Sequence, residues 1–299
     1  MAGAVESYRI GSIDRREVLR YLGYAGQELT PEMDGRIDAV VARALAVARP
    51  RGCVAVFEVD EDASSMDGLR TGASSRAGGP LVAGSNDPAA ALVAAGRLPS
   101  ASGAAEGLVG GAATAPGRAA ARGSDAASDL PVIRLKGAAL ELRGRSIAEH
   151  LAGARAVGVM AVTIGMGVER ELRRLSLTDP VAQVIFDSCA STIVERAADA
   201  AEASLMAQAR ERGLHTNSRF SPGYGDLPME TQPALLATLD AQRRLGITLT
   251  GTLLMTPTKG VTAVVGVFDA PQPTGHRTCK GCLCYDFCTI RPTGRTCRD

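Results

Sequence analysis

The stretch ITLTGTLLMTPTKGVTAVVGVFD, Ile247–Asp269, alternates apolar with polar or small residues in two halves. Residues 257–260, which begin with proline and end with glycine, lie between the halves, and both residue types favour tight turns. The pattern predicts a β-hairpin with its turn at these four residues. Because a hairpin pairs antiparallel strands, it favours an antiparallel or mixed sheet over a purely parallel one.

Helical and strand patterns alternate through the preceding chain. Thr30 is an expected N-cap, as is Asp179 before Pro180, while Ser146 with Glu149 has the spacing of a capping box. These signals predict an α+β fold, a single twisted mixed or antiparallel sheet with helices packed against it. Helices are expected at residues 13–24, 30–50, 179–213 and 229–246 and from residue 146, and strands at residues 53–59 and 157–164 and on both sides of Gly137.

Composition divides the chain into four segments. Residues 61–130 are rich in Gly, Ala and Ser, contain no aromatic residue and show one weak helical patch, which predicts a flexible insertion without chemistry of its own. Residues 1–60 and 131–270 are expected to form the N-terminal and main parts of one domain. Residues 271–299 form a cysteine-rich tail.

The overall balance of residue types excludes several functions. With 33 Lys and Arg against 32 Asp and Glu, the net charge of +1 gives no reason to expect a nucleic-acid or membrane-surface partner. The longest strongly apolar stretch, which starts at Ala156, is shorter than the roughly 18 residues that a membrane span needs, and the first residues lack the apolar core of a secretory signal. A soluble, cytoplasmic protein is expected.

The longest predicted helix carries an apolar stripe of residues at four-residue intervals and a polar stripe beside it. The apolar stripe is expected to face the core, and the polar stripe beside it contains small residues that allow something to approach closely. The apolar stripe is Ile185, Cys189, Ile193, Ala197, Ala201 and Leu205, and the polar stripe is Ser188, Ser191, Glu195 and Asp199.

The loop RFSPGYGDLP, residues 219–228, follows this helix. Pro222 fixes one backbone angle and Gly223 frees the next, so the loop can hold Arg219 and Tyr224 on one side. A guanidinium grips a carboxylate with two hydrogen bonds, and a tyrosine ring offers its face to a cation or a flat base. The loop is therefore either a clamp for a small ligand or a rigid turn whose arginine pairs with a local acid.

This loop, the helix after it and GITLTGTLLMTPTKGVTAVVGV together resemble the activation (reactivation) domain of cobalamin-dependent methionine synthase. IDRREVLRYLGY, HLAGARAVGVMAVTIG and FDSCASTIVE resemble stretches of the standalone members of that family. The resemblance covers most of residues 10–60 and 130–270. It implies a domain that binds S-adenosylmethionine and rests against the cobalamin of a methyltransferase, where one electron and the ligand's methyl group together restore methylcobalamin from inactive cob(II)alamin.

The resemblance also implies particular site residues. The family's ligand-binding arginine and tyrosine match Arg219 and Tyr224, and a backbone contact matches Ser221. A glutamate on the long helix matches Glu195, whose carboxylate can pair with an ammonium or sulfonium; a solvated helix residue is the alternative. An aspartate near the start of the family matches Asp14, for which the role of a helix N-cap is a sufficient explanation.

The chain also departs from the family. Gly251 stands where members often carry an acidic residue, and no Asp-x-His-x-x-Gly cobalamin motif is present. The resemblance therefore implies one component of a methyltransferase, acting in trans on a cobalamin-dependent methionine synthase with a flavodoxin- or ferredoxin-like electron donor. The alternative is an electron-transfer or structural partner of a corrinoid protein that uses the cysteine-rich tail and does not bind S-adenosylmethionine.

Five of the seven cysteines lie in that tail. Thiolates at this density suit zinc or an iron–sulfur cluster, with a redox-active or merely disordered tail as the alternative. The expected metal ligands are Cys279, Cys282, Cys284 and Cys288.

Overall fold

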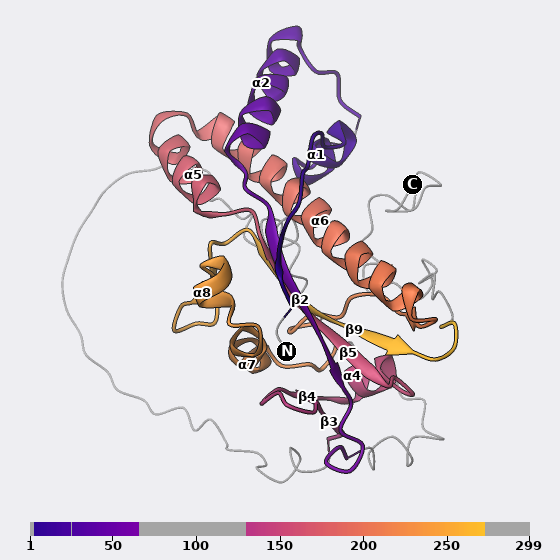
Figure 1. The fold of residues 1–299 in the computed structure, drawn as a ribbon. Helices are drawn as coiled ribbons and strands as arrows, with labels where there is room; N and C mark the ends of the chain where they lie inside the picture. Colours follow the sequence, from indigo (N-terminus) through magenta and orange to yellow (C-terminus); the bar gives the residue numbers. More distant parts are fainter. Residues whose placement is uncertain (1–2, 25, 66–129, 273–299) are drawn as a thin grey trace, which may run out of the picture.

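A five-stranded antiparallel sheet forms the centre of the computed structural model, which describes residues 3–24, 26–65 and 130–272 (Figure 1). The strand order is β1-β2-β5-β9-β6, and every neighbouring pair is antiparallel. The predicted α+β class with a single main sheet is confirmed. The strands are β1 (Val5–Ser7), β2 (Arg51–Glu58), β5 (Ala156–Thr163), β9 (Gly260–Phe268) and β6 (His215–Thr216).

The sheet is covered on both faces, which explains the apolar sequence of its middle strands. All eight residues of β5 are buried. Successive side chains of a strand point to opposite faces, so Met160 and Val162 join one core while Val159 and Ala161 join the other. The domain thus has two apolar cores separated by the sheet.

Four helices cover the first face (Figure 1). The long α6 begins after Asp179, whose side chain accepts a hydrogen bond from the Ala182 N–H, and its predicted apolar stripe is buried. α6 passes so close to β5 that a Cβ added at Gly158 would lie 2.4 Å from the Leu205 side chain, and glycine permits that approach. These helices are α1 (Arg15–Tyr21), α2 (Pro31–Val47), α5 (Met166–Thr178) and α6 (Pro180–Glu211).

Shorter elements cover the second face. They contribute Leu142, Ile147 and Leu235 to its core. They are β3 (Val132–Arg134), β4 (Glu141–Arg143), α4 (Arg145–His150), the 3-10 turn η2 (Met229–Thr231), α7 (Gln232–Thr238) and α8 (Ala241–Leu245).

The hairpin predicted at residues 257–260 is wrong in its position. The hairpin that forms is shorter: β7 (Thr248–Leu249) pairs with β8 (Met255–Thr256). The Thr250 backbone closes its turn with a 2.9 Å hydrogen bond to the Leu254 carbonyl. β9 instead pairs with β5 over eight residues, because that central position buries its apolar residues on both faces.

Two local predictions also need correction, and one helix was not predicted. The helix expected at residues 229–246 is interrupted at Asp240, whose φ of 50° is left-handed. The capping box at Ser146 is absent, because Gly144 is the N-cap of α4 and the Asp226 carboxylate accepts from the N–H groups of Arg145 and Ser146. α5, which has the amphipathic pattern of a surface helix, was missed.

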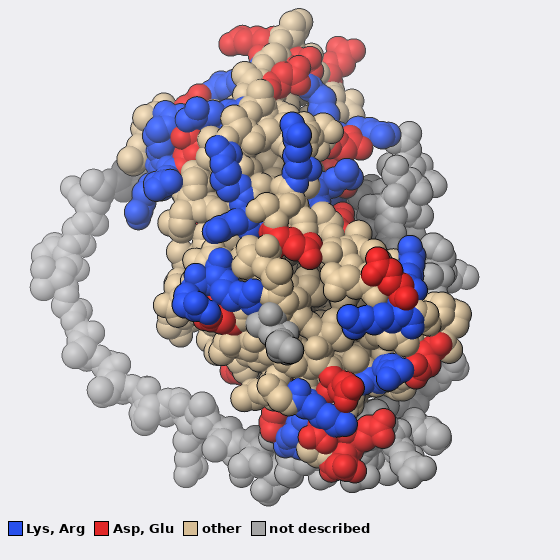
Figure 2. Space-filling model, in the orientation of Figure 1, with Lys and Arg blue, Asp and Glu red and all other residues tan. Residues whose placement is uncertain are grey.

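Surface charge is mixed on the face shown in Figure 2, where Lys and Arg side chains lie beside Asp and Glu side chains. This agrees with the net charge of +1. Among the described helices, none is long and apolar enough to cross a membrane. The expected insertion at residues 61–130 and the tail at residues 271–299 lie almost entirely outside the described residues.

Candidate functional site

A pocket of about 330 Å³ lies between α6, the 219–228 loop and the start of β9. Val194, Pro222 and Val261 contribute to its apolar wall, and α1 and α7 each add one polar side chain. A small-molecule site of this kind combines apolar walls with a few placed polar groups. Its polar side chains are those of Tyr21, Asp187, Ser191, Glu195, Ser221, Tyr224, Gln232, Thr258, Lys259 and Thr262.

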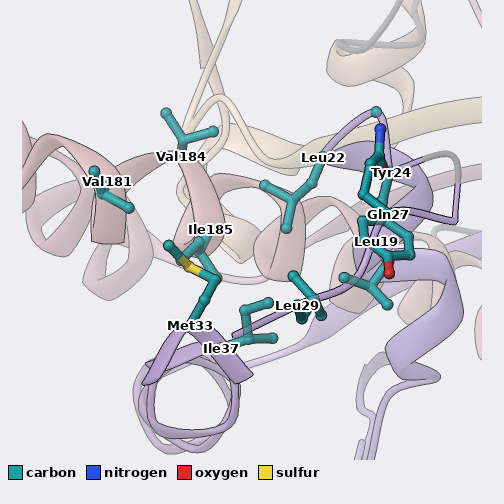
Figure 3. A pocket seen from close by; sticks show the side chains of 11 residues that line it. Leu19, Leu22, Tyr24, Gln27, Leu29, Met33, Ile37, Val181, Val184 and Ile185 are labelled. Carbon is teal, nitrogen blue, oxygen red and sulfur yellow. The ribbon is translucent and has the colours of Figure 1, made fainter. Parts of the chain in front are cut away.

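A larger hollow, of about 490 Å³, lies between α1, α2 and the start of α6 (Figure 3). Leu22, Met33 and Val184 are among the mostly apolar side chains that line it. It contains none of the site residues expected from the sequence. We therefore assign the candidate site to the smaller pocket, whose polar groups can orient a ligand.

Three anchors hold the 219–228 loop against the sheet and α4. The backbone of Phe220 both donates to and accepts from Val264, at 2.8 Å in each direction. The Asn217 side chain accepts from the Gly266 N–H at 2.7 Å, and Asp226 caps α4 with hydrogen bonds of 2.7 and 2.9 Å. The turn itself needs Gly223, whose φ is 90°. The loop is thus a fixed wall of the pocket.

Arg219 fastens this loop to α6. Its Nη2 lies 2.7 Å from Asp199 and 3.7 Å from Glu195, and its Nε lies 3.1 Å from Glu202. Burial raises the pKa of the Glu202 carboxyl, and the neighbouring guanidinium opposes that rise. Arg219 does not line the pocket, and within the described residues its buried Nη1 has no hydrogen-bond partner. This geometry matches the second sequence interpretation, in which the arginine pairs with local acids.

Glu195, Ser221 and Tyr224 all line the pocket. The Glu195 side chain is 49% exposed, so its carboxylate can meet a ligand. The Tyr224 ring is held edge-on to Phe220, with 6.3 Å between the ring centroids, and leaves part of its surface exposed. The structure therefore brings three of the five expected ligand-binding residues to one place.

Asp14 lies outside the lining of the pocket. It is the N-cap of α1 and accepts a 2.8 Å hydrogen bond from the Arg16 N–H, which lowers the pKa of its carboxyl. In this structure Asp14 therefore acts as a helix N-cap.

Lys259 and Asp187 were missed by the sequence analysis. The Lys259 Nζ lies 2.9 Å from the Asp187 carboxylate and donates to the Ser191 hydroxyl at 2.9 Å. Asp187, Ser191 and Glu195 are four residues apart on α6, so the pocket is lined by one side of this helix. A lysine at the start of a strand gave no spacing signal that could have assigned it to this helix.

The pocket and its surroundings carry an excess of negative charge. Among the ion pairs of the described residues, four carboxylates on α6 share two cations, Lys259 and Arg219. A site with this imbalance attracts a ligand that carries positive charge. The four carboxylates are Asp187, Glu195, Asp199 and Glu202.

The expected metal ligands Cys279, Cys282, Cys284 and Cys288 lie outside the described residues. Within the described part of the chain, no group of three or more His, Cys, Asp or Glu residues could hold a metal ion. Cys53 and Cys189 are buried free thiols.

Comparison with known proteins identifies the part of the chain that forms this pocket. Residues 146–274 match the family model of the vitamin B12 dependent methionine synthase activation domain. This segment, under half of the chain, is thus similar to the activation domain of that family. The matched part of the activation domain contains α6, the 219–228 loop and β9, and therefore every polar lining residue of the pocket except Tyr21.

A solved structure extends this likeness beyond the matched segment. The MetH reactivation domain, crystallised with AdoHcy bound, superimposes with a TM-score of 0.50 and 13% sequence identity. The match covers 88% of this chain and 78% of that chain. At this identity the likeness shows a shared fold. No significant match was found among the curated proteins.

Proposed function

We propose that this chain binds S-adenosylmethionine in the pocket beside α6 and reactivates, in trans, a cobalamin-dependent methionine synthase. The observation that carries the proposal is the meeting of Glu195, Ser221 and Tyr224 at one pocket with an excess of carboxylates. S-Adenosylmethionine carries a sulfonium and an ammonium, so negative charge favours it over neutral ligands of the same shape.

The residues present fit such a ligand. The volume of about 330 Å³ falls within the usual range for small-molecule sites. The partly exposed Tyr224 ring offers its face to the flat base or the cation, and Glu195 offers a carboxylate to the positive centre. The related fold of the MetH reactivation domain bound to AdoHcy, the demethylated form of the ligand, supports this assignment.

The chain's own residues hold and orient the methyl donor. Because Glu195 and Tyr224 are both about half exposed, the pocket is open to an approaching partner. S-Adenosylmethionine held by these residues would supply an activated methyl group to the partner's cobalamin, and its demethylated form, AdoHcy, would remain as the product. A flavodoxin- or ferredoxin-like protein would supply the one electron that the reactivation needs.

Calorimetric titration tests the binding part of the proposal. S-Adenosylmethionine should bind more tightly than AdoHcy, because AdoHcy lacks the sulfonium charge. Glu195→Gln should weaken S-adenosylmethionine binding about fivefold, as expected for a partly exposed ion pair worth about 1 kcal/mol, and should reduce the preference over AdoHcy. Glu211→Gln, an exposed residue at the end of the same helix, is the matched control and should change nothing. No heat at millimolar ligand would contradict the proposal.

Recovery of activity tests the in-trans part. An oxidised cobalamin-dependent methionine synthase without its own activation domain should regain activity only when this protein, S-adenosylmethionine and an electron donor are all present. Equal recovery without this protein would refute the reactivation role. Recovery without S-adenosylmethionine would instead favour the electron-transfer or structural partner described above. Zinc or an iron–sulfur cluster at the four tail cysteines stays a prediction.

A further inference from the structure

Lys259 is a buried cation inside the candidate site. Only 10% of its side chain is exposed, although lysine is rarely buried to this extent. Two of its three N–H groups are accounted for within the described residues, by Asp187 and Ser191 at 2.9 Å each. One donor of the ammonium is left for another acceptor.

The backbone around Lys259 is held in place. The Thr258 N–H and hydroxyl both donate to the Glu169 carboxylate, at 3.0 and 2.8 Å. The Lys259 carbonyl accepts from the Ile164 N–H at 3.3 Å. The ammonium is therefore presented from a fixed segment at the start of β9.

Stability alone does not explain the buried ion pair between Lys259 and Asp187. Removing two charges from water costs several kcal/mol for each, and well-packed apolar residues of similar volume often stabilise a protein as well or better. A buried lysine that also lines a pocket is thus a candidate for ligand recognition.

Among the described lining residues, Lys259 is the only basic one. Arg219 lies outside the lining and pairs with Glu195, Asp199 and Glu202. A ligand carboxylate that enters this pocket would have Lys259 as its cationic partner. We propose that Lys259 binds the carboxylate of the amino-acid part of the ligand. This inference rests on the proposed function, since it assumes that the pocket holds S-adenosylmethionine.

The charges along α6 suit this orientation. Asp187 is neutralised by Lys259, whereas Glu195 lies eight residues further on, about 12 Å along the helix axis. The pocket thus has a cation at one end and an excess of carboxylate toward the other. A zwitterionic ligand places its carboxylate at the Lys259 end and its positive centres toward Glu195.

A ligand without the carboxylate gives a sharp test. Decarboxylated S-adenosylmethionine has one more net positive charge, so the acidic pocket would favour it if Lys259 took no part. If Lys259 binds the carboxylate, the wild-type protein should instead bind S-adenosylmethionine at least tenfold more tightly, since a hydrogen bond between charged groups contributes about 1.5–3 kcal/mol. The preference should vanish in Lys259→Met.

Three further variants keep the test falsifiable. Lys259→Met combined with Asp187→Leu leaves no unpaired buried charge, so it should fold, and it should also lack the preference. Asp187→Asn keeps the ammonium and should retain the preference. Lys136→Met removes an exposed lysine that pairs with Glu58 and should behave as wild type. Thermal melting confirms that each variant is folded before titration.

The outcomes separate the two proposals. If the wild-type protein binds both ligands equally, or prefers the decarboxylated one, the role of Lys259 is wrong while the proposed function stands. If the wild-type protein prefers S-adenosylmethionine and both variants that lack Lys259 keep this preference, the proposed carboxylate-binding role of Lys259 is also wrong. If the wild-type protein binds neither ligand, the proposed function fails and the role of Lys259 fails with it.

Discussion

At the scale of single residues, Glu171 shows how the helical layer uses charge. Its side chain is 8% exposed and forms ion pairs with Arg174 of its own helix and Arg43 of α2. The hydrogen bonds from Arg174 and Arg43 lower the pKa of the Glu171 carboxyl to about 2. This group therefore joins α5 to α2 as long as it is ionised.

Glu171→Gln should make stability less dependent on pH. A depressed folded pKa contributes stability that is present above the unfolded value, near 4.5, and is lost as the pH falls toward 2. At pH 7 the variant should be less stable by about 2 kcal/mol, after allowance for the partly exposed arginines, and the difference should shrink between pH 4.5 and 2. Denaturant unfolding at several pH values measures this, with Glu211→Gln as control. A constant difference across that window would contradict the assignment.

At the scale of elements, the 219–228 loop and α4 depend on each other. Asp226 accepts hydrogen bonds from the Arg145 and Ser146 N–H groups, so the loop caps the helix while the helix fixes the end of the loop. Tyr224, on the same loop, lines the pocket. Under the proposed function, Asp226 would be a positioning residue, which acts on the ligand through the loop.

Asp226→Ala should reduce both stability and ligand affinity. Loss of a side-chain cap costs about 1 kcal/mol, and the freed loop should weaken S-adenosylmethionine binding several-fold. Thr30→Ala removes the cap of α2, far from the loop in sequence, and should lower stability by a similar amount without changing affinity. Thermal melting and calorimetry measure the two effects. Equal affinities in the two variants would show that the loop needs no such anchor.

At the scale of the whole molecule, the segment at residues 66–129 leaves and rejoins the domain at one place. Ser65 and Val132 form an isolated antiparallel bridge with two backbone hydrogen bonds, of 2.9 and 2.8 Å. The two ends therefore need no long connection between them. This supports the proposal that residues 61–130 are an insertion into one domain.

Replacing residues 66–129 with a short Gly/Ser linker should leave the domain folded. The melting temperature should stay the same or rise, because closing a shorter loop costs up to roughly 2 kcal/mol less entropy. The affinity for S-adenosylmethionine should equal that of the full chain, which is the control. A loss of affinity with an unchanged melting temperature would show that the segment contributes to the site.

Most of the elements could be predicted from local signals. The caps Asp14, Thr30 and Asp179 and the apolar stripe of α6 are patterns within one helix, and α1, α2 and α6 begin as these caps predict. Local signals did not predict which strand pairs with β9. Pairing with β8 or with β5 satisfies the same backbone groups, and burial of both faces of β9 decides between them.

The same distinction between local and long-range features holds for the candidate site. The loop's turn, its tyrosine and the polar stripe on α6 that includes Glu195 follow from the sequence by itself, because backbone restriction and helical periodicity are local properties. Only the tertiary structure decided that Arg219 is paired with Asp199 and Glu202, and that Lys259, just before β9, meets Asp187 in the pocket. The physical reason is that a charged side chain takes its role from whichever opposite charges the packing of distant elements brings within a few ångströms.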